Sequence, residues 1–223
     1  MRVVDARKSE AGYTLAELMV AMVITLILVG LAGKFLEGAF NVRLREDERS
    51  VALADAQRAL NIISREVANA GFGLSNNGIV AADSGAGGIR VRANLNAFDG
   101  VLTSNSVSDS QEDVRYRLVS TSNNSYIERL DVNTGAKVAV LSNRVDDFTV
   151  AYFRDKVEYE AEDCEITADA AEVTDKMTAR YVVIAVCVEL PARGTPGGEG
   201  YQPPSSVQLV SGVALRNANL ARY

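Results

Sequence analysis

The sequence predicts an α+β protein in which one long N-terminal helix packs against a C-terminal antiparallel β-sheet. Residues 13–33 form an apolar run of 21 residues with a single charged side chain, that of Glu17. Apolar residues then recur at helical spacing as far as Ala70, and strand-like alternation of polar and apolar residues begins near residue 114. A helical half followed by a run of strands favours the α+β class over an alternating α/β fold.

The composition argues against several classes of protein. A net charge of −6 disfavours a nucleic-acid-binding protein, so no nucleic-acid partner is expected. The chain has no histidine, which excludes a Ser-His-Asp triad and histidine-based metal sites. Two cysteines, Cys164 and Cys187, are too few for a disulfide-rich scaffold or a four-thiolate zinc site. We therefore expect a protein that is not an enzyme, with no cofactor and no metal.

The apolar run at residues 13–33 is long enough to cross a membrane. About 20 residues with a rise of about 1.5 Å each span the roughly 30 Å hydrocarbon core of a bilayer. Residues 1–12 carry three basic and two acidic side chains, which favours a cytoplasmic N-terminus and a chain that is otherwise outside. A secretory signal fits less well, because its apolar stretch is about 7–15 residues long and a small-residue cleavage site follows it. Residues 34–37 (KFLE) offer no such site.

Glu17 is the unusual residue of this run. A charged residue inside a spanning helix costs at least about 2.5–3.5 kcal/mol on insertion scales, so its default interpretation is functional. A plain membrane anchor gives no reason for it. The alternative is that Glu17, four residues into the run, merely lies at the edge of the headgroup layer.

The residues around Glu17 resemble a known signal. Gly12, Tyr13, Thr14 and Leu15, with Glu17 two positions further on, are similar to the class III signal of type IV prepilins and type II secretion pseudopilins. The resemblance implies that a prepilin peptidase cuts between Gly12 and Tyr13 and methylates the new N-terminus. Tyr13 stands where the family usually has phenylalanine. Glu17 would then pair with the new α-amine of a neighbouring subunit and act as the subunit-docking residue, which fixes the register of a filament.

The helix is expected to continue beyond residue 33. Apolar residues separated by steps of three and four form one stripe, which predicts an amphipathic helix packed on the globular domain. The stripe comprises Leu53, Ala56, Leu60, Ile63, Val67 and Ala70. No proline precedes Pro191, and Gly71 and Gly73 provide a stop, so we expect one helix over residues 13–70. The alternative is two helices with a kink near Gly30, Gly33 or Gly38.

The second half of the chain reads as loops and strands. Residues 74–113 are rich in Gly, Ser, Asn and Asp, which predicts loops with a few short strands, such as one at 88–93. Residues 180–190 form a nearly continuous β-branched run, as expected of a central strand. Residues 133–135 (NTG) predict a hairpin turn. The other strands are expected near residues 114–118, 125–131, 136–141, 148–152 and 206–216.

Three segments suggest ligands but lack the required pattern. Residues 83–88 (DSGAGG) are not followed by the Lys-Ser/Thr of a phosphate-binding loop. The sequence DVNTG from Asp131 resembles the start of a calcium loop, yet Ser142 occupies the position of the required glutamate. The acidic residues of 158–175 are interpreted as a solvated loop; a calcium site there is the alternative, without any ligand geometry to support it.

The two cysteines are a candidate disulfide. If the chain is outside the cytoplasm, Cys164 and Cys187 reach an oxidising compartment in which a bridge forms. In the loop-entropy model such a bridge contributes about 3 kcal/mol. The alternative is that Cys187, within the expected central strand, is simply a small buried apolar residue.

The remainder of the chain most resembles PilW-type minor pilins. Arg65, Ala70, Gly71 and Phe72 match the end of the long helix in that family, and residues 145–152 and 213–217 are also similar. The type II secretion pseudopilin J has the same layout and is the close alternative. A mature length of 211 residues (223 minus 12), and Lys34 where major pilins commonly have proline, indicate a minor subunit.

The resemblance implies four parts and a location. Residues 1–12 are a leader peptide, 13–33 a transmembrane and filament-core helix, 34–72 an amphipathic helix, and 73–223 a β-rich head. The chain would cross the inner membrane once, with its head in the periplasm, and then enter a pilus (fimbrium) at the cell surface. Expected partners are prepilin peptidase, the inner-membrane assembly platform, and other major and minor pilins. A membrane-anchored periplasmic binding domain or enzyme with an uncleaved leader is the alternative from another class.

Overall fold

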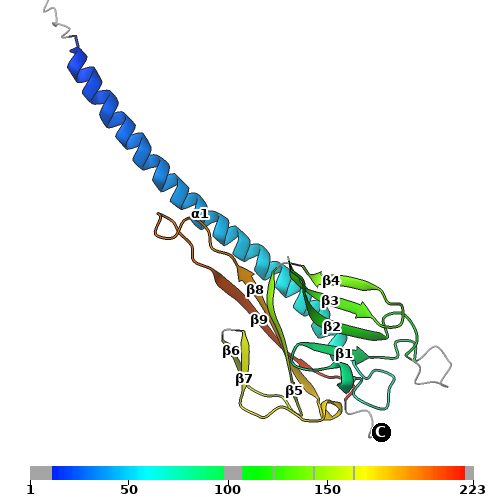
Figure 1. The fold of residues 1–223 in the computed structure, drawn as a ribbon. Coiled ribbons are helices and arrows are strands. Elements are labelled where there is room, and N and C mark those ends of the chain that lie inside the picture. Colours follow the sequence, from blue (N-terminus) through cyan, green and yellow to red (C-terminus); the bar gives the residue numbers. More distant parts are fainter. Residues whose placement is uncertain (1–11, 98–106, 123, 143, 163, 219–223) are drawn as a thin grey trace, which may run out of the picture.

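The computed structural model describes residues 12–97, 107–122, 124–142, 144–162 and 164–218. The expected leader peptide, apart from Gly12, therefore lies outside the described residues. The described chain comprises one long helix, α1, followed by a β-rich head (Figure 1). The N-terminal half of α1 projects away from the head, and its C-terminal half lies along it.

Helix α1 runs without interruption from Leu15–Ala68, 54 residues or about 81 Å at a rise of about 1.5 Å per residue. The kinked alternative is therefore wrong. The helix ends two residues earlier than expected, with Asn69 as the C-cap. The chain then reverses at Gly71, which adopts a left-handed conformation (φ 79°) and whose N–H donates to the carbonyl of Arg92.

The buried stripe of α1 lies one position away from the expected one at its start. Leu53 is 37% exposed, whereas its neighbour Ala52 is only 4% exposed. From there the small side chains of Ala52, Ala56 and Ala59 are buried against the head. Because alanine adds little volume, the sheet approaches the helix backbone closely, and the longer Leu53 is displaced to the flank of the contact.

The sheet is divided, in contrast to the single sheet expected. Four antiparallel strands form the first sheet in the order β1-β2-β3-β4, and three form the second in the order β5-β8-β9. The division falls between β4 and β5, where Arg144 has a φ of 33°, and β5 pairs with β8 and not with β4. Strand β8 is central, as predicted. The strands are β1(Gly88–Arg92), β2(Asp113–Ser120), β3(Ser125–Asp131), β4(Lys137–Leu141), β5(Val145–Phe153), β8(Tyr181–Leu190) and β9(Ser205–Ala214).

One apolar core joins α1 to both sheets, and a polar network crosses it. Ile63 of α1, Tyr116 of β2 and Phe148 of β5 are fully buried in this core. The hydroxyl of Tyr116 donates to Glu66 at 2.5 Å, and Arg129 binds the same carboxylate at 2.8 Å. Burial, reinforced by the Glu66 charge, raises the pKa of Tyr116, so the hydroxyl remains a donor. The network links the helix to the first sheet.

The acidic tract at residues 158–175, which the sequence predicted to be a solvated loop, is not a loop throughout. It contains a hairpin of β6(Tyr159–Glu162) and β7(Glu165–Ala168). Tyr159 and Ile166 of this hairpin pack on Phe153 and Val183 of the second sheet. Successive residues of a strand point to opposite faces, so the hairpin covers the face of the second sheet that is turned away from α1. The head is therefore layered locally as helix, sheet and hairpin.

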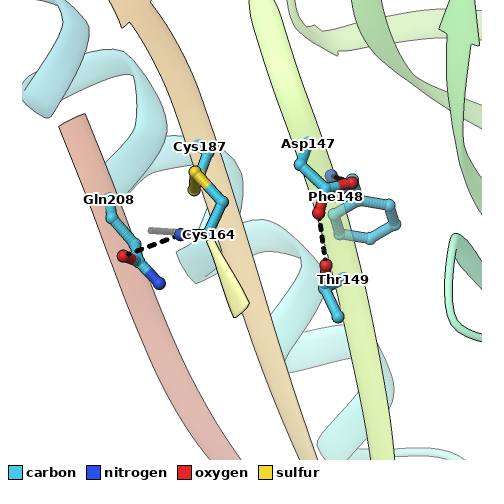
Figure 2. Close-up of a disulfide and its surroundings, with 6 residues drawn as sticks. All are labelled: Asp147, Phe148, Thr149, Cys164, Cys187 and Gln208. Carbon is cyan, nitrogen blue, oxygen red and sulfur yellow. Dashed lines mark hydrogen bonds between the residues drawn. A yellow bond between two sulfur atoms is a disulfide. The ribbon is translucent and has the colours of Figure 1, made fainter. Parts of the chain in front are cut away.

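A disulfide fixes the hairpin to the sheet. Cys164, at the turn between β6 and β7, is bonded to Cys187 of the central strand, with 5.9 Å between their Cα atoms. The backbone N–H of Cys164 also donates to the side-chain oxygen of Gln208 on β9 at 3.3 Å (Figure 2). The pair that the sequence offered as a candidate is thus joined in the structure.

The loop between β8 and β9, residues 191–204, lies against α1 and is here called the neck loop (Figure 1). The buried guanidinium of Arg45 donates to the carbonyls of Pro191 and Pro203. Arg193 pairs with Glu48, and this hydrogen bond holds the pKa of Glu48 below its usual value. The neck loop therefore fixes the end of the head to the helix.

Gly200→Ala should loosen this junction. Gly200 has a φ of +72°, and a Cβ there would meet the Cα of Gly38 at 2.3 Å, a backbone contact that cannot yield without moving the loop. The left-handed conformation alone costs an alanine about 1–3 kcal/mol, and the displaced loop adds to that loss. The measurement is chemical denaturation of the full chain in detergent. Gly197→Ala is the matched control, since its φ is +79° with nothing within 4 Å; equal losses for both variants would contradict the close contact.

Candidate functional site

The residues of the expected processing signal lie at the free end of α1, far along the helix from the head (Figure 1). Gly12 and Tyr13 precede the first helical residue and are exposed in the structure. A Cβ at Gly12 would have nothing within 4 Å. Thr14 is extended, with φ −76° and ψ 152°. The peptide bond between Gly12 and Tyr13 thus lies in accessible, non-helical chain, as a protease substrate requires.

Thr14 and Glu17 form a capping box at the start of α1. The Thr14 hydroxyl oxygen accepts from the N–H of Glu17 at 3.2 Å. The Oε2 atom of Glu17 accepts from the N–H of Thr14 at 2.8 Å and from its hydroxyl at 2.9 Å. Two backbone donors that a helix start leaves unpaired are satisfied in this way. Sequence reasoning missed this local role of Glu17, although the Thr-x-x-Glu spacing at residues 14–17 is its signature.

The capping box places the Glu17 carboxylate next to the site of the expected cut. Oε2 binds the N–H of Thr14, one residue from the nitrogen that a cut after Gly12 would convert to an α-amine. Oε1 accepts no hydrogen bond from any residue that the structure describes. One carboxylate oxygen is therefore held by its own helix, while the other remains available to a cationic partner.

The apolar half of α1 has the surface of a membrane span. Helix α1 is the one helix in the described part of the chain that is long and apolar enough to cross a membrane. None of its most apolar 18-residue segment is buried in the structure. Its large side chains, such as Leu18, Ile24 and Leu31, are exposed. The hydroxyl of Thr25 donates to the carbonyl of Ala21 at 2.7 Å, so this polar group is satisfied within the helix.

In the other two loops that suggested ligands, polar groups form hydrogen bonds within the protein itself. The carboxylate of Asp131 accepts from the hydroxyl of Ser110 and from the N–H of Gln111, Asn133 and Thr134, so it closes its own turn. In the loop at residues 83–88, the carbonyls of Gly85 and Gly88 accept from the hydroxyl of Tyr152. Within the described ranges, no three Cys, Asp or Glu side chains come together as a metal would need.

Comparison with known proteins identifies the N-terminal segment. Residues 7–33 match the family model described as the prokaryotic N-terminal methylation motif. No curated protein matches the chain. Among solved structures, a type IV-like pilin from Thermus thermophilus is 14% identical, with a TM-score of 0.42, over 74% of this chain and 97% of that one. The chain thus carries this methylation motif at the start of a long helix packed on antiparallel sheets. The motif and the apolar helix together indicate a chain that is anchored in a membrane.

Proposed function

We propose that this protein is a PilW-like minor subunit of a type IV pilus that takes part in priming assembly or in forming the tip. The observation that carries the proposal is the methylation motif at residues 7–33, placed at the free end of a helix whose apolar half contacts no part of the described head. A helix of this kind needs either lipid or other apolar helices around it. A subunit that moves from a membrane into a filament provides both in turn.

Each part of the signal then has a defined role. Prepilin peptidase cuts between Gly12 and Tyr13 and methylates Tyr13, with Thr14 and Leu15 as part of the recognised motif. The stem, residues 13–33, holds the subunit in the inner membrane with the head in the periplasm, and later lies in the filament core. Glu17 accepts the α-amine of a neighbouring subunit through its free Oε1 atom, because a pair of opposite charges offsets the cost of placing either in an apolar core.

One feature favours a minor subunit, and two other functions compete with it. Lys34 stands where major pilins usually have proline. A pseudopilin J-like subunit of a type II secretion system would share the motif, the long helix and processing by prepilin peptidase. A membrane-anchored periplasmic binding domain or enzyme would instead keep its leader.

Processing is the direct test of the proposal. We expect the protein recovered from membranes of its host to begin at Tyr13 and to carry one added methyl group, as measured by N-terminal sequencing and intact mass. A chain that begins at Met1 in cells with active prepilin peptidase would contradict the proposal and favour the anchored domain. If the chain is processed, deletion of its gene distinguishes the two systems. Loss of a pilus subunit should abolish surface pili, whereas loss of a pseudopilin should abolish the export of secreted proteins.

A further inference from the structure

The glycine-rich loop at residues 83–88 lines a pocket on the first sheet together with two arginines. Arg115 and Arg117 of β2 complete most of the lining, and the pocket has a volume of about 290 Å³. Both arginines lie on the face of the sheet opposite to Tyr116, whose hydroxyl binds Glu66 of α1. The pocket is therefore on the side of the first sheet that is turned away from α1. Figure 1 shows this sheet at the C-terminal end of α1, remote from the stem.

The loop is held in a fixed position. Gly85 and Gly88 form an antiparallel bridge with hydrogen bonds in both directions, so Ala86 and Gly87 are the two residues of a tight turn. The N–H of Val150 on β5 donates to the carbonyl of Ala86 at 2.7 Å, which fixes this turn to the second sheet. The pocket is therefore built into the fold.

The fold does not require glycine at two positions of this loop. Gly85 and Gly87 have no positive φ, and a Cβ on either would meet nothing within 4 Å. Gly88 differs, because a Cβ there would meet the carbonyl oxygen of Tyr116 at 2.7 Å. The N–H of Gly87 also donates to no group in the described part of the chain. Glycine at such positions allows a ligand to approach the backbone closely.

Arginines outnumber carboxylates around the pocket, although the chain has a net charge of −6. The Nη1 atom of Arg115 lies 3.1 Å from Asp83, but the buried Nε of Arg115 has no hydrogen-bond partner among the described residues. Arg117 directs Nε and Nη2 at a single oxygen of Glu128. Because a guanidinium carries five N–H donors, both side chains have donors left for an anion. The arginines are Arg90, Arg92, Arg115 and Arg117, and the carboxylates are Asp83, Asp113 and Glu128.

Asp83 restricts the class of anion that the pocket can hold. Its carboxylate is part of the lining, and the hydrogen bond from Arg90 holds the pKa of Asp83 below its usual value, so the group is ionised at neutral pH. This charge would repel a doubly charged phosphate. A singly charged carboxylate with neighbouring hydroxyl groups fits better, because the hydroxyls can donate to Asp83 while the carboxylate faces the arginines.

We infer that this pocket binds an acidic sugar of the uronic acid class, either free or as a residue of a polysaccharide. The sugar carboxylate pairs with Arg115 and Arg117, and its hydroxyl groups donate to Asp83. The ring lies against the loop backbone where Gly85 and Gly87 leave space. Ligand pockets commonly begin at about 300 Å³, so this one suits a single sugar ring. The inference goes beyond the proposed function, because it assigns a ligand to the head.

Calorimetric titration of the full chain in detergent tests the ligand class at physiological salt. Trigalacturonic acid should bind at least about tenfold more tightly than triglutamate, which has carboxylates without sugar hydroxyls, or maltotriose, which has hydroxyls without charge. Equal binding of triglutamate, or tighter binding of tripolyphosphate, would overturn the inference, as would no binding of trigalacturonic acid. Galacturonic acid alone distinguishes the two sources of the sugar: equal affinity indicates a free sugar, and much weaker binding indicates a polysaccharide.

Three variants test the site. Arg115→Gln should lower the affinity for trigalacturonic acid by about tenfold or more, because a charge-assisted hydrogen bond is lost. Arg58→Gln, on an exposed part of α1, changes the net charge equally and should stay within about twofold of wild type. Gly87→Leu breaks no ion pair and adds a side chain at the pocket wall, so it should fold normally yet bind about tenfold more weakly. Disulfide formation and thermal unfolding show that each variant has folded. Wild-type affinity in Gly87→Leu, or in folded Arg115→Gln, would overturn the inference.

Discussion

Glu17→Gln should leave the protein inserted and correctly cut, yet reduce the fraction that is assembled by about tenfold or more. Glutamine keeps a side-chain oxygen that can accept from the N–H and hydroxyl of Thr14, so the capping box is retained. What is lost is the negative charge. The α-amine of a neighbouring subunit would then be buried without a partner. A tenfold loss of assembled protein corresponds to only about 1.4 kcal/mol, which is below the typical cost of breaking a buried ion pair. The measurement is the ratio of filament-associated to membrane-associated protein. Glu17→Ala, which loses the cap and the charge together, should abolish assembly.

Thr14→Ala is the complementary variant, because it weakens the cap and keeps the charge. Loss of an N-cap hydroxyl costs about 1 kcal/mol of helix stability, and the bilayer stabilises the first turn independently. We therefore expect Thr14→Ala to assemble at a level close to wild type. The reverse pattern, with Glu17→Gln assembled normally and Thr14→Ala not, would mean that Glu17 acts only as a cap and that charge does not set the register.

Local patterns predicted the elements of the fold well because each pattern is decided by neighbouring residues. The stripe on the C-terminal half of α1, the β-branched run of β8 and the turn at residues 133–135 were all recognisable, and the structure has a helix, a central strand and a hairpin at these places. The processing motif is equally local, since its residues are contiguous from Gly12 to Glu17. Patterns of this kind need no knowledge of the rest of the chain.

Pairing between distant segments was not predictable in the same way. Alternation in β5 says which residues face the core, but not that β5 pairs with β8 rather than with β4. The β6–β7 hairpin was hidden because exposed glutamates alternate with Tyr159 and Ala161 on one strand, so that the acidic character dominated the pattern. Leu44 and Val51 of α1 line one groove with Val188 and Leu190 of β8, and only the fold brings these residues together.

Removing the disulfide with Cys164→Ala and Cys187→Ala together should destabilise the head by about 3 kcal/mol. The bridge closes a loop with a sequence separation of 23, and the loop-entropy model gives a cost of that size for releasing it. Apart from the disulfide, a small apolar cluster and the hydrogen bond from Cys164 to Gln208 connect the hairpin to the sheet. Denaturation of the full chain in detergent measures the loss, and hydrogen exchange shows where it occurs.

Exchange should rise first in β6 and β7, because the acidic residues of this hairpin form no ion pair within the described residues and their mutual repulsion favours release once the covalent link is gone. Phe153 and Val183 beneath it would then meet water. A reductant distinguishes the effect of the covalent bond from the effect of side-chain packing. Reduced wild type retains both thiols as small apolar groups, so its free energy of unfolding should match that of the double variant to within about 1 kcal/mol. The same reductant should leave the double variant unchanged. If reduced wild type keeps its full stability, Cys187 acts as a packed apolar residue and the bridge contributes little.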